Sequence, residues 1–286
     1  TGIGATEMAA IWATGKIWLR VPETLKITVK GKFKKGVYAK DLILHIIGRL
    51  TVEGANYKSV EFYGDTIERM SVSERMTLSN LSMEMGAKCA LIPFDSVSED
   101  YFKASGLPFD KSKAVYSDPD ASYEQTLDID ASALEPQVAC PHNVDNVKNI
   151  SAMPETIVHQ ALLGSCTNGR LDDIEIAASI LKGKKVSKNV RLLVFPASRT
   201  VLLQAIEKGY ITELIQAGAV VMNPGCGPCL GAHAGLLADG ERVISSSNRN
   251  FKGRMGSAAA EVYLGSPAMV AASAITGKIT DPREFV

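Results

Sequence analysis

The stretch on which the rest of the chain depends is Asn223-Pro224-Gly225-Cys226-Gly227-Pro228-Cys229-Leu230-Gly231. It places two thiols two residues apart in a loop of glycine and proline, a spacing that lets both sulfurs reach one metal centre. The glycines let the backbone approach a bulky inorganic group, because they carry no Cβ atom. A C-x-x-C pair alone is shared by zinc sites, dithiol redox sites and iron–sulfur sites. The surrounding sequence therefore has to decide among these three.

The segments around this loop alternate between strand and helix. Apolar runs predict strands at 157–163, 190–195, 219–222 and 242–245. Helical spacing of apolar residues, with glycines at the ends, predicts helices at 171–181, 200–208 and 211–217. This alternation favours an α/β fold with a largely parallel sheet and helices on its faces.

Three polar motifs each follow one of these strands. They are Ser165-Cys166-Thr167-Asn168, the cysteine loop at 223–231, and Ser247-Asn248-Arg249-Asn250. In an open parallel sheet, ligands bind outside the carboxyl ends of the strands. We therefore expect Cys166 to converge with Cys226 and Cys229, although sixty residues separate the first from the second.

The first part of the chain predicts further alternation. Helices are expected at 6–14, 39–48 and 73–86, and strands at 25–30, 59–64 and 90–93. Residues 95–121 are polar and rich in Asp and Ser, which favours a domain boundary near 118. We expect three parts: 1–33 as the remnant of an N-terminal domain, 34–118 as a middle α/β domain, and 119–286 as a C-terminal α/β domain carrying the three cysteines. Because the chain opens on Thr1 rather than Met, we expect it to lack its natural N-terminal part.

Composition argues against a nucleic-acid-binding protein, a membrane protein and a disulfide-rich secreted protein. The chain has 286 residues with 31 basic and 31 acidic side chains, so no overall field attracts nucleic acid. No apolar run is long enough to span a membrane. Five cysteines, an odd number, do not suit a disulfide framework, which favours a reducing, cytoplasmic location. Cys89 and Cys140 are expected to be buried or neutral thiols.

Three converging thiolates restrict the possible chemistry. Structural zinc takes four protein ligands, a dithiol redox site needs two cysteines, and a four-iron cluster normally takes four thiolates. With three thiolates, one iron keeps an open position at which a substrate hydroxyl can bind and leave as water. The count favours such a Lewis-acid site, with a structural zinc or unrelated thiols as the alternatives.

A resemblance to the aconitase family is carried by Gly164-Ser165-Cys166-Thr167-Asn168-Gly169-Arg170, Gly225-Cys226-Gly227-Pro228-Cys229-Leu230-Gly231 and Ser247-Asn248-Arg249-Asn250-Phe251-Lys252-Gly253-Arg254. Within the family, the chain is most similar to the large subunits of the two-subunit enzymes that interconvert 2- and 3-isopropylmalate in leucine biosynthesis. The resemblance runs over the whole chain. It implies an aconitase-like multi-domain fold, with three-layer α/β/α domains and mostly parallel sheets.

The resemblance also implies a cofactor and a reaction. The cofactor is a [4Fe-4S] cluster held by Cys166, Cys226 and Cys229. The reaction is that of a hydro-lyase, which moves a hydroxyl between adjacent carbons by dehydration to an alkene and rehydration.

Two residues of the first half match the family's Asn/Glu pair beside the cluster. These are Asn80 and Glu84, whose spacing of four is expected to place them on one helix face. The resemblance implies that Glu84 hydrogen-bonds the leaving hydroxyl or the bound water.

Four further residues match the family's loops around the cluster. Arg249 and Arg254 match two arginines, and bidentate pairing of guanidinium with carboxylate suits a substrate that carries two carboxylates. Asn168 and Asn248 are expected to orient the cluster ligands by hydrogen bonding, without binding the cluster's metal themselves.

The family also carries parts that are not found in this sequence. An Asp-His pair, another His and an Asp-Ser-His motif belong before the point at which this chain begins. The family's catalytic serine and a further substrate arginine belong to a swivelling domain, which is a separate small subunit in the two-subunit enzymes. The expected activity therefore needs a small-subunit partner, and a folded but inactive fragment is one of the hypotheses for this chain.

The expected substrate is a small hydroxy acid with two carboxylates. Homocitrate and citramalate are the main alternatives to isopropylmalate, because the family's large subunit binds the polar half that all these substrates share. A cluster-sensing RNA-binding protein is a distant alternative, since it requires a basic groove that the balanced charge does not suggest.

Overall fold

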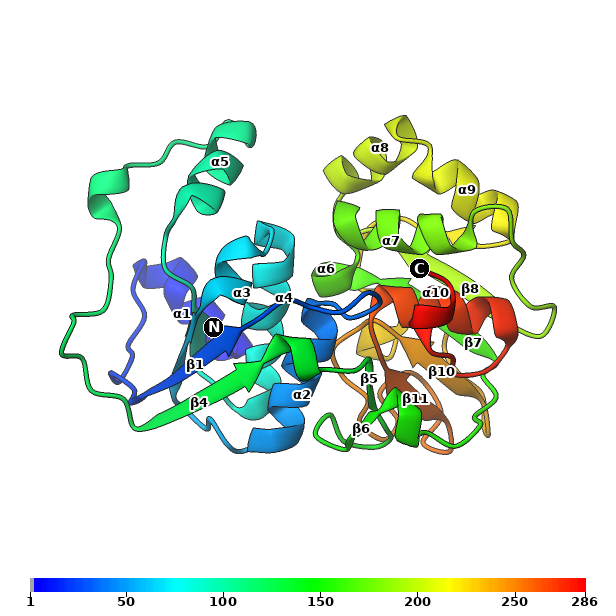
Figure 1. Ribbon diagram of the computed structural model, residues 1–286, viewed down its shortest axis with the longest axis horizontal. Helices are drawn as coiled ribbons and strands as arrows, with labels where there is room; N and C mark the ends of the chain where they lie inside the picture. Colours follow the sequence, from blue (N-terminus) through cyan, green and yellow to red (C-terminus); the bar gives the residue numbers. More distant parts are fainter. Residues whose placement is uncertain (1–2) are drawn as a thin grey trace. The chain divides into compact units, whose positions relative to one another are not determined.

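The computed structural model describes residues 3–286, which divide into two compact units. Unit 1 runs up to Lys32 and again from Leu50 to Ala131, whereas unit 2 consists of Phe33–Arg49 and Ser132–Val286. The chain therefore leaves unit 1 after its first strand, contributes a helix to unit 2 and then returns (Figure 1). The three-part division at 33/34 and 118/119 stays a prediction. The two compact units have other boundaries, because strands that precede residue 33 and strands that follow residue 118 belong to the same sheet.

Unit 1 contains a parallel sheet, which among residues 3–286 has four strands. Their order is β3 (Cys89–Leu91), β2 (Ser59–Tyr63), β1 (Thr24–Lys30) and β4 (Gln125–Asp130). Leu25, Ile27 and Val29 of β1 are at most 2% exposed, whereas the residues between them are half-buried. This alternation is the pattern that predicted the strand at 25–30.

The helices of unit 1 are α1 (Ala5–Thr14), α3 (Asp65–Arg69), α4 (Val72–Leu81) and α5 (Ser96–Ala104). Helix α5 lies in the polar stretch 95–121, where no helix was predicted. Asp95 begins this helix as its N-cap and accepts a hydrogen bond from the Ser98 N–H at 3.0 Å.

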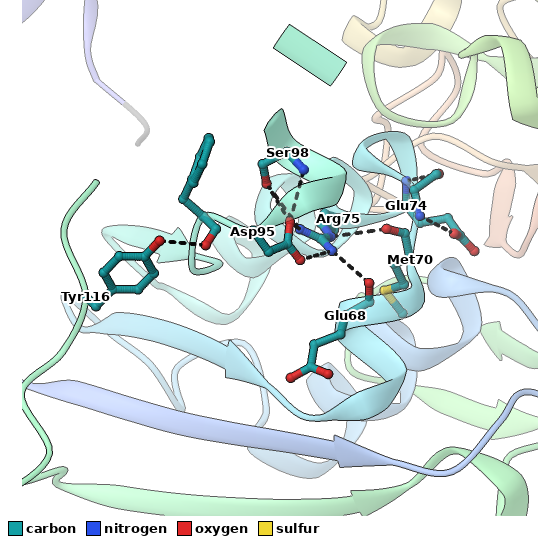
Figure 2. Close-up of polar contacts among 9 residues, drawn as sticks. Glu68, Met70, Glu74, Arg75, Asp95, Ser98 and Tyr116 are labelled. Atoms are coloured by element: carbon teal, nitrogen blue, oxygen red, sulfur yellow. Dashed lines mark hydrogen bonds and ion pairs between the residues drawn. The ribbon is translucent and has the colours of Figure 1, made fainter. Parts of the chain in front are cut away.

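An ion pair with a buried guanidinium and a partly exposed carboxylate joins α4 to this N-cap (Figure 2). The Arg75 side chain donates to the two carboxylate oxygens of Asp95 at 2.8 and 2.6 Å, and also to the carbonyls of Glu68 and Met70. Arg75 is only 4% exposed. The loops that follow β2 and β3 are therefore held together by one guanidinium.

The helix predicted at 73–86 is wrong in its second half. The α-helix ends at Leu81 and continues as a 3-10 helix, η1 (Ser82–Met85). The tighter winding follows from the end of the helix, where Gly86 turns into the left-handed region and its carbonyl accepts from the Tyr57 N–H. Asn80 and Glu84 therefore lie on two different kinds of helix, and their spacing of four does not place them one above the other on a single α-helical face.

Unit 2 contains a mixed sheet, which among the described residues has seven strands. Their order is β6 (Val147–Asn149), β5 (Gln137–Ala139), β11 (Glu261–Leu264), β10 (Arg242–Ser245), β7 (Gln160–Gly164), β8 (Arg191–Phe195) and β9 (Val220–Val221). The run from β11 to β9 is parallel, and β5 is antiparallel to both of its neighbours. The predicted α/β fold with mostly parallel sheets is confirmed.

The remaining helices of unit 2 are α2 (Ala39–Leu50), α6 (Ser165–Asn168), α7 (Leu171–Leu181), α8 (Arg199–Glu207), α9 (Tyr210–Ala217) and α10 (Pro267–Thr276). Figure 1 shows α7 and α10 side by side against the sheet, with α8 and α9 beyond α7. The short 3-10 helices of the chain are η1, η2 (Lys111–Lys113), η3 (Ala131–Ala133), η4 (Ile150–Ala152), η5 (Gly227–Leu230) and η6 (Pro282–Glu284). None of the helices within residues 3–286 is both long and apolar enough to cross a membrane.

The two faces of β7 and β8 are covered differently. Ala161, Leu163, Leu192 and Val194 belong to the apolar core shared with α7, α9 and α10. On the opposite face, the irregular segment 223–241 crosses the strands, and the Gln160 side chain donates to the Gly235 carbonyl at 2.8 Å. The cysteine loop thus begins a segment that is fixed to the body of the sheet.

Candidate functional site

The order of the strands in unit 2 reverses between β7 and β10. From β7 the chain continues through β8 to β9 on one side, and through β10 to β11 on the other side. The crevice outside the carboxyl ends of the strands at such a reversal is where open parallel sheets bind ligands. The loops that leave β7, β9 and β10 are the three that carry the polar motifs.

The turn after β7 is tight and strained. Gly164 has a φ of 121° and Ser165 a φ of 71°, and few residues other than glycine adopt positive φ. A Cβ added to Gly164 would lie 2.0 Å from the Phe195 carbonyl oxygen, and one added to Gly169 would lie 2.5 Å from the same atom. Glycine is therefore required on both sides of α6. The Cys166 residue within this short helix is exposed.

The cysteine loop after β9 folds back over β8. Gly227 has a φ of 55°, and a Cβ at this position would lie 2.7 Å from the Phe195 ring. The Cys229 N–H donates to the Cys226 carbonyl at 3.2 Å at the start of η5. Cys226 is exposed and Cys229 is half-buried, so both thiols remain accessible.

The loop after β10 joins this arrangement through buried polar groups. Ser246, which is fully buried, accepts a hydrogen bond from the Gly164 N–H at 2.8 Å. Asn248 Nδ2 donates to Thr167 Oγ1 at 3.0 Å. Both bonds tie the β10 loop to the turn that presents Cys166.

The two predicted arginines lie in this same loop. The Arg254 carbonyl oxygen lies 3.2 Å from the place of a Cβ on Gly231, so its backbone touches the cysteine loop. Arg254 Nε is buried and has no hydrogen-bond partner among the described residues. Arg249 directly follows Asn248 and is half-buried.

Cys226 is influenced by both of the other thiols. Burial raises the pKa of Cys226, Cys166 and Cys229 raise it further, and Arg254 lowers it. The fold thus places Cys166 within electrostatic reach of Cys226. Among residues 3–286, no three His, Cys, Asp or Glu side chains are grouped closely enough to hold a single metal ion.

Asn168 is anchored to a buried carboxylate. Its Nδ2 donates to Asp173 Oδ1 at 3.1 Å, and the Arg170 N–H donates to the other carboxylate oxygen at 3.0 Å. Burial raises the pKa of Asp173 to about 7, although these two hydrogen bonds and the charge of Lys40 lower it. The contact ties the α6 turn to the start of α7, which the predicted role of Asn168 did not include.

Asn80 and Glu84 belong to unit 1, whereas the cysteines belong to unit 2. Asn80 is half-buried near the end of α4, and Glu84 is 8% exposed on η1. Their predicted role beside a cluster stays a prediction.

Sequence reasoning missed Lys40, which is 1% exposed and donates to the carbonyls of Ser246 and Ser247 at 3.0 and 2.8 Å. The only signal was a Lys-Asp pair in the first turn of an otherwise apolar helix. A charge in such a place is rarely buried unless it has a partner.

Comparisons with known proteins agree over the length of the chain. The aconitase family (aconitate hydratase) matches residues 1–277. The probable methanogen homoaconitase large subunit of Methanosarcina mazei is 54% identical, over 100% of this chain and 72% of that protein. The probable 3-isopropylmalate dehydratase large subunit of Methanothermobacter thermautotrophicus is also 54% identical, over 99% of this chain and 67% of that protein.

Two further comparisons complete this picture. The 3-isopropylmalate dehydratase large subunit 2 of Archaeoglobus fulgidus is 52% identical, over 100% of this chain and 68% of that protein. A crystal structure of Thermococcus kodakaraensis aconitase X is 15% identical, with a TM-score of 0.43, and the match covers 80% of this chain and 50% of that one. The family match and the identities above 50% show that this chain belongs to the aconitase family.

Proposed function

We propose that this chain is the large subunit of a [4Fe-4S]-dependent hydro-lyase that interconverts 2-isopropylmalate and 3-isopropylmalate in leucine biosynthesis. The observation that carries the proposal is that the turn with Cys166 and the loop with Cys226 and Cys229 both pack on Phe195 of β8, at the strand reversal of unit 2. Relatives named 3-isopropylmalate dehydratase large subunit support the choice of substrate, including one from Thermotoga maritima that is 50% identical.

The chemistry of the donors fits the proposed cluster. Thiolates are the ligands of iron–sulfur clusters, and in a four-iron cluster each binds a separate iron, so three thiols need not meet as closely as the ligands of one ion. Buried polar atoms of Ser165, Asn248 and Arg254 have no hydrogen-bond partner among the described residues. Such atoms carry a cost that a polar or charged group in the site would relieve.

The cluster, when bound, would supply a Lewis-acidic iron for a substrate hydroxyl. The residues of this chain would bind and orient the substrate. Arg249 and Arg254 would pair with its carboxylates, because a guanidinium donates two parallel hydrogen bonds to a carboxylate. Asn248, fixed to Thr167, would hold the β10 loop against the turn that carries Cys166.

Glu84 would hydrogen-bond the leaving hydroxyl and give it the proton with which it departs as water. Asn80 would orient the Glu84 carboxyl. Glu84 is 8% exposed, and a carboxyl within hydrogen-bond reach of a reacting hydroxyl can act on it as a general acid or base. A small subunit with the swivelling domain would supply the catalytic serine, and assembly with it is part of the proposal.

Homocitrate is the second candidate substrate. The relative from Methanosarcina mazei that is 54% identical is named a homoaconitase large subunit, as is one from Methanothermobacter thermautotrophicus that is 52% identical. The experiment is to assay the chain with a small subunit and a reconstituted cluster on 2-isopropylmalate and on homocitrate. A higher kcat/KM for 2-isopropylmalate is expected, and a clear preference for homocitrate would overturn the first proposal.

The cluster ligands can be tested before any activity is found. Cys166→Ser is expected to abolish the visible absorbance that wild-type protein gains on anaerobic reconstitution with iron and sulfide. Cys89→Ser is the matched control, because this thiol lies in unit 1 and contacts the Ser59 hydroxyl at 3.4 Å. Equal absorbance from the two variants would remove Cys166 from the ligand set.

A further inference from the structure

The Lys40 side chain reaches the site from a part of the chain far from the three loops. It comes from α2, yet its Nζ donates to the carbonyls of Ser246 and Ser247, which are 206 and 207 residues away in sequence. Both serines are fully buried and stand directly before Asn248 and Arg249. The ammonium therefore holds the backbone from which these two side chains project.

The same two carbonyls belong to a loop that is fixed from its other side. The Ser246 hydroxyl accepts from the Gly164 N–H, and the Ser246 N–H donates to the Leu162 carbonyl at 3.0 Å. One peptide segment is thus held between β7 and the Lys40 ammonium. Any movement of Lys40 would be transmitted both to Asn248 and to the turn before Cys166.

Burial of this charge needs an explanation. Moving a lysine ammonium out of water is costly, and buried charges are therefore paired and hydrogen-bonded. A purely structural tie at this place could be made by a neutral donor or by apolar packing. An ammonium adds a strong, charge-assisted bond to each carbonyl and leaves a positive charge below the loop.

We propose that Lys40 is a positioning residue of this site: its buried ammonium fixes the peptide carbonyls of Ser246 and Ser247, and thereby the position of Asn248 and Arg249. The role in substrate binding rests on the function proposed above, whereas the role in holding the loop does not. The charge of Lys40 also lowers the pKa of Asp173, the carboxylate that anchors Asn168, so the same ammonium acts on the turn after β7.

The test is Lys40→Met, which keeps the length of the side chain but removes its charge and its donors. Lys185→Met is the matched control: it removes a lysine–carbonyl hydrogen bond of 2.7 Å, to Gln216, from the exposed surface of the same unit. Amide hydrogen exchange is measured by mass spectrometry on the chain, and KM and kcat are measured on the reconstituted complex with the small subunit.

Lys40→Met is expected to accelerate exchange in the peptide covering 245–250 by about ten- to a hundredfold over the control, because bonds from a charged donor are lost. It is also expected to raise KM for the hydroxy acid more than it lowers kcat. Exchange in 245–250 that matches the Lys185→Met variant would overturn the proposal. If the loop loosens but the wild-type complex turns over none of the substrates, the positioning role stands and the proposed function fails.

Should Lys40→Met not fold, Lys40→Gln takes its place. Its shorter, neutral amide loses the charge and the reach with which the ammonium bonds both carbonyls, so faster exchange confined to 245–250 is again expected. Exchange there equal to wild type would show that the loop does not depend on the Lys40 ammonium.

Discussion

Each of the two units buries one cation against loops that follow parallel strands, but the partners of the two cations differ. In unit 1, the Arg75 guanidinium pairs with the Asp95 carboxylate and also donates hydrogen bonds to two backbone carbonyls. In unit 2, Lys40 donates to two carbonyls of the loop after β10. The Arg75 guanidinium thus joins a carboxylate to nearby backbone, whereas the two carbonyls bound by the Lys40 ammonium are backbone of the candidate site itself.

The two sheets also differ in the side chains that lie at the carboxyl ends of their parallel strands. Next to Arg75, unit 1 has a cavity of about 420 Å³ whose wall includes the aromatic side chains of Phe62, Tyr63, Phe94 and Tyr116. The corresponding edge of unit 2 carries thiols, amides and guanidinium groups. Similar parallel sheets thus support an edge with aromatic side chains beside an ion pair in one unit, and an edge with thiols and amides in the other, so the loops decide the chemistry.

The largest effect is expected for the ion pair of unit 1. Arg75→Ala leaves the Asp95 carboxylate, whose side chain is 29% exposed, without its bidentate partner; breaking a fully buried pair costs about 3 to 5 kcal/mol of unfolding free energy, and we expect a loss near the lower end of this range. Urea denaturation measures this loss. Arg69→Ala is the control, because its pair with Asp65 is exposed on both sides and is worth about 1 kcal/mol or less. Similar losses of unfolding free energy in both variants would mean that burial of Arg75 adds nothing to the stability that its ion pair contributes.

The cysteine loop of unit 2 allows a sharper comparison within three residues. Gly227→Ala would force a Cβ against the Phe195 ring at a positive φ, which is expected to cost about 2 to 4 kcal/mol. Gly225→Ala meets no atom within 4 Å and is expected to be nearly neutral. Thermal unfolding gives the stability, and the rate of thiol alkylation at Cys226 reports the loop. Equal behaviour of the two variants would contradict the tight packing of this loop on β8.

The effect that is smallest for a single step, here one pH unit, concerns how α2 is docked in unit 2. Asp41 is fully buried and accepts hydrogen bonds from the N–H groups of Tyr38 and Gln137 at 2.8 Å each. Burial raises the pKa of Asp41 from 3.8 to about 7, although these hydrogen bonds lower it. The folded state therefore binds this proton more tightly than the unfolded state, and the corresponding stability is lost as the pH rises from about 4 to about 7.

Asp41→Asn is expected to remove this one-proton dependence, which is at most about 1.4 kcal/mol per pH unit. Urea midpoints measured between pH 4 and pH 8 test it. The control is Asp239→Asn, a carboxylate on the exposed segment before β10. An unchanged slope for Asp41→Asn would show that this carboxyl stays ionised in the folded protein.

Most of the parallel framework could be predicted from the sequence, since β7, β8, β10, α7, α8 and α9 carry clear apolar periods and closing glycines. Helix α10 could not be predicted, because nearly all of its surface is buried and its small residues form no polar stripe. Strands β5 and β6 have three residues each, too few to show an alternation.

The candidate site divides in the same way. The loops with Cys166, Cys226 and Arg254 follow predicted strands, so their approach could be anticipated from the rule for parallel sheets. Lys40 could not be anticipated, because nothing local in α2 indicates a loop more than two hundred residues away. The helix that carries Asn80 was predicted, whereas the change to a 3-10 helix before Glu84 depends on the turn at Gly86.

The detour of the chain through α2 has a consequence for biosynthesis. Helix α2 leaves the ribosome before the rest of its unit, with eight buried positions that belong to a unit whose remainder begins only at Ser132. Its apolar surface must wait, exposed or shielded by a chaperone, until the loop after β10 has been made. A gene cut at residue 132 would separate Lys40 from its carbonyls, so neither half is a natural unit for expression or for evolutionary exchange.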